Sequence, residues 1–163
     1  MLITTYRKKY GEIIEKFDVK ETSMGLKNLP IGDQSFAELL KAGSLYVDKT
    51  QYIYNLLKSR SRYFLSRPRR FGKSLTCSTL AAIFAGCKEV FKGLWIAEQS
   101  NYDWQPHPVI YLDFSGISHG SPDELRLGLH SAFDDNAQEN NLILSKTLLK
   151  EKFAELIKKM AQA

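Results

Sequence analysis

Three consecutive residues, Gly72-Lys73-Ser74, carry the clearest chemistry in the sequence. They match the end of the phosphate-binding pattern G-x-x-x-x-G-K-[ST]. In such a loop the glycine lets the backbone approach the phosphates, the lysine ammonium binds the β- and γ-phosphates, and the hydroxyl ligates Mg²⁺. The match is partial, because Arg67 stands where the pattern has its first glycine. A Gly-Lys-Ser triplet also arises by chance, so its surroundings decide its meaning.

The charge around this triplet is strongly positive. The chain has 163 residues and a net charge of +5, and residues 1–74 hold 15 Lys and Arg against 7 Asp and Glu. Between Asp48 and Glu89 there are nine basic residues and no acidic one. Such a block suits a polyanion, either a nucleotide or a nucleic acid, although a solvated basic face is the other reading. The candidate nucleotide-binding residues of the loop are Arg67, Arg69, Arg70, Phe71, Gly72, Lys73, Ser74 and Leu75.

The elements on either side of the loop are those that a phosphate-binding loop needs. Residues 63–65 form a short apolar run of the size of a buried strand, and the apolar spacing of residues 73–84 predicts a helix that ends at Gly86. Residues 109–114 are nearly all apolar, as in a parallel strand that is covered on both faces. The sequence therefore predicts an α/β fold. Further helices are expected over residues 4–19, 35–41 and 49–59, from a capping Ser121 onward, and over 145–160.

The longer pattern resembles a bacterial AAA-ATPase-like family whose members often join a P-loop ATPase module to a C-terminal PD-(D/E)xK nuclease-like domain. An arginine at the position of the first glycine, as in SRPRRFGKS, is typical of that family. The stretches that carry the resemblance are LPIGDQSFAELL (29–40), YVDKTQYIYNLL (46–57), YFLSRPRRFGKSLTCSTLAAIFAG (63–86), FKGLWI (91–96) and HPVIYLDFS (107–115).

The resemblance implies a P-loop NTPase-like fold with a three-layer parallel sheet, incomplete here, and helical segments at both ends. Residues 1–28 would be an N-terminal helical extension, and residues 29–163 the N-terminal part of the ATPase domain. ATP and Mg²⁺ are the implied cofactors, with Lys73 on the phosphates and Ser74 on the metal. The family also implies that Tyr46, Asp48 and Lys49 lie near the nucleotide. The alternative for that segment is a helix capped by Asp48 that packs on the core.

The acids that hydrolysis requires are not evident in the sequence. Asp113 ends an apolar run, as the metal-binding acid of a P-loop ATPase does, but Phe114 follows it and not a second acid. In the family the acids lie on a later strand that ends in Asp-Glu-Tyr-Asp, and no such segment precedes Ala163. We therefore expect a truncated domain that binds ATP, with hydrolysis doubtful in this chain alone. Asp113 is expected to have at most an indirect, weak role toward the metal.

Two other functions stay open at the level of sequence. One is a nucleic-acid-binding module that uses the basic block. The other is a non-catalytic remnant or interaction fragment, in which an unpaired sheet edge recruits a partner protein or a second copy. Two cysteines make no disulfide framework and no apolar run approaches about 20 residues, so a cytoplasmic protein without a membrane partner is expected. Asp134 and Asp135 are expected on a solvated helix face.

Overall fold

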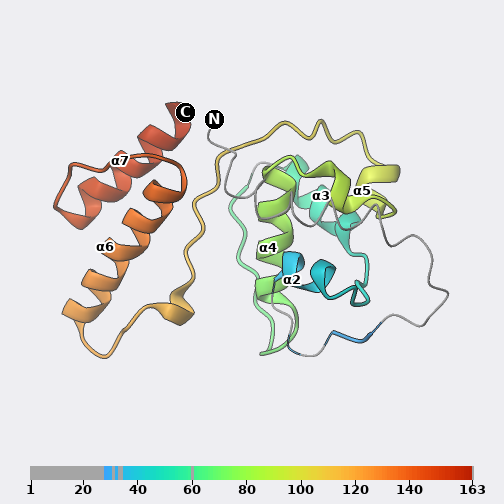
Figure 1. Ribbon diagram of the computed structural model, residues 1–163, viewed down its shortest axis with the longest axis horizontal. Helices are drawn as coiled ribbons and strands as arrows, with labels where there is room; N and C mark the ends of the chain where they lie inside the picture. The colour runs from blue at the N-terminus through green and yellow to red at the C-terminus, as the bar shows by residue number, and fades with distance from the viewer. Residues whose placement is uncertain (1–27, 31, 33–34, 60, 163) are drawn as a thin grey trace. The chain divides into compact units, whose positions relative to one another are not determined.

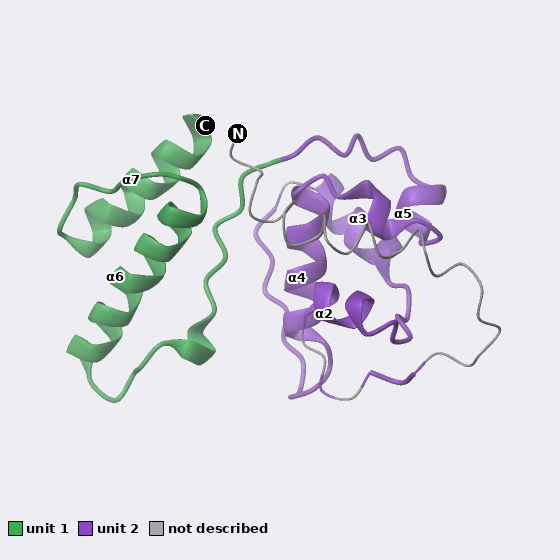
Figure 2. Cartoon of the chain, viewed as in Figure 1, with its two compact units in different colours: residues 1–5, 107–163 green, residues 6–106 purple. Residues whose placement is uncertain are grey.

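The computed structural model describes residues 28–30, 32, 35–59 and 61–162 of the chain (Figure 1). These residues form two compact units, one up to Pro106 and one from His107 onward (Figure 2). The helix expected over residues 4–19 lies outside the described residues. The expected division into residues 1–28 and 29–163 stays a prediction.

The unit up to Pro106 is built from short helices around an aromatic core. Phe36 is fully buried, and its ring stacks on that of Phe91 at 4.9 Å and meets Tyr46 edge-on at 5.1 Å. Ile83 and Ile96 are fully buried in the same core. The elements are α2 (Phe36–Lys41), α3 (Thr50–Lys58), α4 (Lys73–Phe84), the 3-10 helix η1 (Lys88–Phe91) and α5 (Trp95–Glu98).

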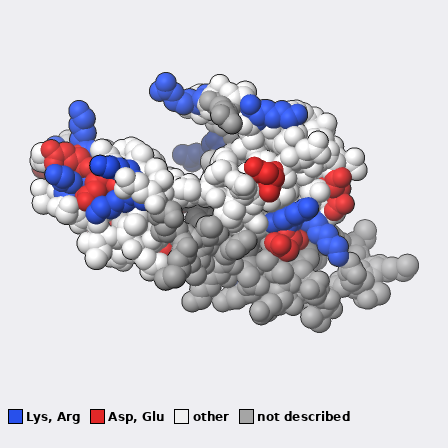
Figure 3. Space-filling view, turned by 90° about the horizontal axis from the view of Figure 1, so that it is seen from above, with Lys and Arg blue, Asp and Glu red and all other residues white. Residues whose placement is uncertain are grey.

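The unit from His107 onward is dominated by two helices that lie side by side (Figure 1). Its elements are the 3-10 helix η2 (Phe114–Gly116), α6 (Pro122–Glu139) and α7 (Leu149–Gln162). Phe133 of α6 stacks on Phe153 of α7 at 4.9 Å, and Leu156 and Met160 are buried beside them. Basic and acidic side chains are interleaved on the surface of this helix pair (Figure 3).

The predicted parallel sheet is wrong for the part of the chain that the structure describes, which contains helices and irregular segments but no β-strand. Residues 63–65 and 109–114, the two expected strands, belong to irregular segments apart from Phe114, which begins η2. A strand exists only where a neighbouring strand takes up its backbone hydrogen bonds, and apolar character alone does not supply that partner. The three-layer α/β architecture is therefore not the fold of the described residues.

The segment from Val109 to Leu112 shows what replaces the sheet. The Asn136 side chain of α6 accepts a hydrogen bond from the Tyr111 N–H at 2.9 Å and donates one to the Tyr111 carbonyl at 3.0 Å. This amide thus satisfies both backbone groups that a neighbouring strand would otherwise pair. Ile110 and Leu112 pack against the core of the helix pair, so the apolar run is explained by contact with helices.

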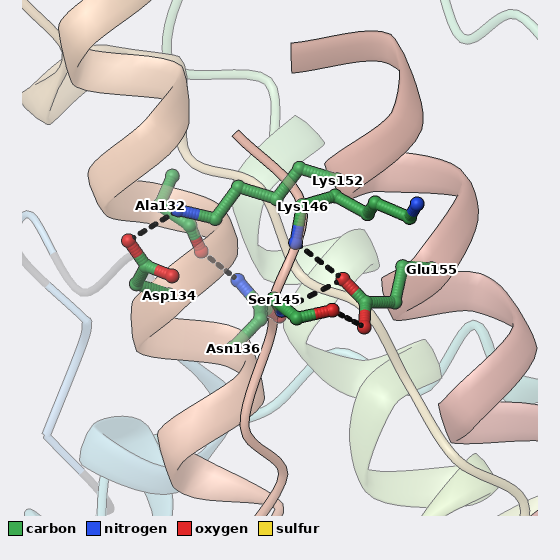
Figure 4. A network of polar contacts seen from close by, with 7 residues as sticks. All are labelled: Ala132, Asp134, Asn136, Ser145, Lys146, Lys152 and Glu155. Carbon is green, nitrogen blue, oxygen red and sulfur yellow. Dashed lines mark hydrogen bonds and ion pairs between the residues drawn. The ribbon is translucent and has the colours of Figure 1, made fainter. Parts of the chain in front are cut away.

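Unlike the predicted strands, the predicted helices are found close to their expected positions. α2, α3 and α4 lie where apolar spacing placed them, and α4 has the predicted bounds. α6 begins at Pro122 after Ser121, whose hydroxyl accepts a hydrogen bond from the Glu124 N–H at 3.2 Å. α7 begins later than expected, since the N–H groups of Ser145 and Lys146 are bound to the Glu155 carboxylate at 2.9 and 3.0 Å (Figure 4).

Candidate functional site

The candidate loop ends in a left-handed glycine that starts α4. Gly72 has φ of 73° and ψ of 23°, a conformation that glycine adopts without strain. Its carbonyl accepts the first helical hydrogen bond, from the Thr76 N–H at 2.9 Å. The three preceding N–H groups, of Lys73, Ser74 and Leu75, are those that a helix start leaves available to other acceptors. Together with the helix dipole they make this helix start favourable for an anion.

The Lys73 side chain folds back over the loop that precedes it. Its ammonium donates hydrogen bonds to the carbonyl of Arg67 at 2.6 Å and to that of Pro68 at 2.9 Å. The loop thus wraps around the ammonium and is tied to the first turn of α4. Arg67, which stands where the general motif has its first glycine, contributes here through its backbone carbonyl, which any residue type would supply.

The side chains between Arg67 and Phe71 are all exposed. The Arg67 guanidinium reaches the Phe71 carbonyl at 3.5 Å, the long limit of a hydrogen bond. Arg70 has φ of 66°, a left-handed conformation that is uncommon outside glycine. The structure therefore brings Arg67, Phe71 and Lys73 together and leaves Arg69 and Arg70 facing solvent.

Ser74 and Leu75, in the first turn of α4, have different surroundings. Ser74 is exposed, so its hydroxyl is accessible at the helix start. Leu75 is half-buried and packs against the aromatic core, while its carbonyl accepts hydrogen bonds from Ser78 and Thr79. The Leu75 side chain is thus a packing residue, and only its backbone N–H remains suited to a phosphate.

Asp48 joins two helices. One carboxylate oxygen accepts the Thr50 N–H at 2.8 Å and the Thr50 hydroxyl at 2.7 Å, and the other accepts the Trp95 N–H at 2.6 Å. The Thr50 hydroxyl in turn accepts the Ile96 N–H at 3.0 Å. The starts of α3 and α5 are therefore both satisfied by this pair of side chains. Asp48 thus accepts the N–H of the first residue of α3, as the predicted cap would, although Lys49 holds the N-cap position. The bond to Trp95, 47 residues away, was not predicted.

The neighbours of Asp48 have different surroundings. Tyr46 is half-buried, and its burial raises the pKa of its phenol. A hydrogen bond with Thr79 lowers this pKa in part, and the negative charge of Asp48 raises it further. Its ring packs on Phe36, so Tyr46 is part of the aromatic core. Lys49 is exposed immediately before α3. Their predicted closeness to a nucleotide stays a prediction.

Asp113 belongs to the other compact unit. Its carboxylate caps η2 by accepting the Ser115 N–H at 2.8 Å. Hydrogen bonds from the Ser115 side chain and backbone hold the pKa of Asp113 below its ordinary value. This cap gives Asp113 a structural role, and its weak, indirect role toward a metal stays a prediction.

The described residues contain no group of three or more His, Cys, Asp or Glu side chains that could hold a metal ion by itself. No helix in the described ranges is long and apolar enough to cross a bilayer. Asp135 is exposed, as predicted for this helix face, whereas Asp134 is only partly exposed and binds the buried Lys152 ammonium at 2.6 Å (Figure 4).

Comparison with known proteins assigns the chain to a family. Residues 30–163 match the model of a family described as predicted AAA-ATPase, AAA-ATPase-like. The chain belongs to this AAA-ATPase-like family. It is also 37% identical over 137 residues to a protein of Azotobacter chroococcum mcd 1 described as an uncharacterized protein in the vnfD 5′ region. The match covers 83% of this chain and 26% of that relative, so the chain spans about a quarter of its length. No solved structure matches the chain.

Proposed function

We propose that this AAA-ATPase-like chain binds ATP through a variant Walker A loop, RPRRFGKS, that runs from Arg67 to Ser74 and continues to the Leu75 N–H. The observation that carries the proposal is the Lys73 ammonium, held by the Arg67 and Pro68 carbonyls next to the start of α4. Those carbonyls are neutral acceptors. Phosphate oxygens carry negative charge, and an ammonium is attracted more strongly to a charged oxygen than to a neutral carbonyl, so a triphosphate would compete for the ammonium.

The charge of the loop supports a polyphosphate ligand. Arg67, Arg69 and Arg70 are exposed beside Lys73, and no acidic residue lies between Asp48 and Glu89 to repel it. Phe71 is exposed next to Gly72, where it would lie beside the bound nucleotide. Tyr46 and Lys49 stay candidate neighbours of the nucleotide on family grounds, whereas the contacts of Asp48 support a structural role.

The proposal includes Mg²⁺ bound with the nucleotide. Mg²⁺ usually takes one or two protein oxygens and fills its remaining positions with phosphate oxygens and water. The exposed Ser74 hydroxyl at the helix start fits that requirement, and a cluster of carboxylates is unnecessary. When bound, the metal would neutralise phosphate charge, and Asp113 would influence it only indirectly.

The activity that we propose for this chain is the binding of ATP. We also place the protein in the cytoplasm, which its cysteine use supports. The chain has only two cysteines, Cys77 exposed and Cys87 buried, and not the disulfide framework of small secreted domains.

Titration with the fluorescent analogue mant-ATP, with and without Mg²⁺, tests the proposal on the wild type and on Lys73→Ala. A charge-assisted hydrogen bond contributes about 1.5–3 kcal/mol, so Lys73→Ala should weaken Mg²⁺-dependent binding by about tenfold or more. The matched control is Lys88→Ala, which removes an exposed lysine of η1 in the same unit and should bind as the wild type does. Equal binding by wild type and Lys73→Ala, or no binding by either, would refute the proposal.

A further inference from the structure

Residues 61–71, with the sequence SRYFLSRPRRF, form a segment in which every side chain is exposed. It contains three aromatic residues and four arginines, with no acidic residue. Phe64 is 93% exposed, Phe71 63% and Tyr63 52%. Large aromatic side chains normally provide core contacts, and a run of them left in water marks an interaction surface. We refer to residues 61–71 as the aromatic–arginine segment.

The aromatic–arginine segment is anchored at two points. Near its start, the Tyr63 hydroxyl donates a hydrogen bond to the Leu56 carbonyl at the end of α3, at 2.9 Å. Near its end, Lys73 of α4 binds the carbonyls of Arg67 and Pro68. Pro68 also fixes one backbone angle between these anchors. A segment held in this way presents its side chains in a restricted arrangement, which lowers the entropic cost of binding a ligand.

The aromatic–arginine segment contains both aromatic rings and positively charged guanidinium groups. Arg62 precedes Tyr63 and Phe64, and three more arginines precede Phe71. An apolar protein surface would cover the rings but would leave these guanidinium groups without countercharge. A single nucleic-acid strand satisfies both, because its bases stack on aromatic rings and its phosphates pair with arginines. Charge complementarity therefore favours a strand over an apolar protein partner.

We infer that the aromatic–arginine segment binds single-stranded nucleic acid without sequence preference, with bases stacked on Tyr63 and Phe64 and a phosphate held by Arg62. This activity goes beyond the proposed binding of ATP. Phe64 and Arg62 lie outside the candidate nucleotide site, so the two activities can be separated by substitution. The fold of the described residues supports the choice of Phe64, since a side chain this exposed contributes little to the core.

Fluorescence anisotropy with a labelled thymidine oligonucleotide of about 20 nucleotides tests the inference, using the full chain. An abasic strand of the same length is the second probe, because it carries phosphates but no bases. Phe64→Ala should weaken binding of the thymidine strand by at least about fivefold and leave binding of the abasic strand unchanged. Arg62→Ala should weaken both and reduce the slope of log K against log salt by about 0.7.

The matched control is Ile143→Ala, which truncates another highly exposed apolar side chain, in the unit from His107 onward, and should change neither binding. Equal binding of the two strands by the wild type, no binding of either, or an unchanged affinity of Phe64→Ala would overturn the inference. So would a wild-type dimer that Phe64→Ala converts to a monomer, since a second copy would then cover the segment.

Mant-ATP binding by Phe64→Ala should equal that of the wild type. A wild type that binds the strand but not mant-ATP would refute the proposed function alone.

Discussion

Asp48 is the residue whose role the structure defines best. Each of its carboxylate oxygens accepts a backbone N–H, that of Thr50 at the start of α3 and that of Trp95 at the start of α5. Helix starts leave N–H groups unpaired, and a carboxylate in this position also interacts favourably with the helix dipole. Thr50, which Asp48 binds through its N–H and its hydroxyl, is fully buried, so this contact lies partly inside the unit.

We expect Asp48→Ala to lower the free energy of unfolding by about 1–3 kcal/mol, because it removes one helix cap and leaves the Trp95 N–H without its acceptor. Urea denaturation followed by tryptophan fluorescence measures this loss. Asp48→Asn keeps one acceptor oxygen and should recover part of it. Glu89→Ala, an exposed acid of η1, is the charge control and should stay within about 0.5 kcal/mol of the wild type. A loss of mant-ATP binding without loss of stability would instead assign Asp48 to the nucleotide.

The residues of the site were predictable to different degrees. Gly72, Lys73 and Ser74 could be placed at a helix start because a motif and an apolar period are both local. The Asp48 cap on α3 is local as well, since donor and acceptor lie two residues apart. Its bond to Trp95 and the pairing of Lys152 with Asp134 join residues far apart in the chain, and no local pattern specifies them.

At the scale of elements, the end of α4 is followed by Gly86, where both the backbone conformation and the surrounding space require a glycine. Gly86 has φ of 71°, and a Cβ there would lie 2.8 Å from the Trp104 carbonyl oxygen and 3.1 Å from Pro106 Cγ. The chain after α5 therefore passes directly over this glycine. The contact positions Trp104, whose ring packs on Phe91 at 5.2 Å.

We expect Gly86→Ala to destabilise the unit up to Pro106 strongly. The left-handed backbone costs a non-glycine residue about 1–2 kcal/mol, and the clash with backbone adds about 1–3 kcal/mol. Gly93→Ala is a matched control, because Gly93 has φ of 81° but open space around its Cβ position. Urea denaturation of both variants should show a larger loss for Gly86→Ala. Equal losses would mean that the chain over Gly86 moves aside without cost.

The contrast between helices and strands follows from the range of the interactions that form them. α4 and α6 were predictable because their caps and apolar stripes lie within the segment itself. The strands expected at residues 63–65 and 109–114 depended on partners elsewhere in the chain. In the described residues Tyr111 is instead paired with the Asn136 side chain, and the rings of Tyr63 and Phe64 stay exposed.

At the scale of the whole molecule, the two compact units have separate cores and separate optical probes. Both tryptophans of the chain, Trp95 and Trp104, lie in the unit up to Pro106, so tryptophan fluorescence reports on that unit. Much of the helical signal in circular dichroism comes from α6 and α7, the two longest described helices. A substitution in one core can therefore be followed by its effect on each probe.

We expect Glu155 to make the unit from His107 onward sensitive to acid. Its carboxylate binds the Lys159 ammonium at 2.8 Å. It also accepts the N–H groups of Lys146 and Ser145, which joins α7 to the segment before it (Figure 4). The Lys159 hydrogen bond, followed by that from the Lys146 N–H, lowers the pKa of Glu155 from 4.5 to about 2. Because the pKa is lower in the folded state, the ionised carboxylate stabilises the fold above about pH 4.5. That stabilisation is lost as the pH falls toward 2.

We therefore expect Glu155→Gln to lower the thermal midpoint measured by circular dichroism at pH 7. This difference from the wild type should shrink steadily between about pH 5 and pH 2, because the wild-type protein loses the stabilisation from its ionised carboxylate over that range. The transition seen by tryptophan fluorescence should stay unchanged, since the substitution lies in the other unit. Glu151→Gln, an exposed glutamate in the first turn of α7, is the matched control and should show a much smaller difference at pH 7. A difference for Glu155→Gln that persists undiminished at pH 3 would contradict the assigned pKa. A parallel shift in tryptophan fluorescence would show instead that the two units unfold as one.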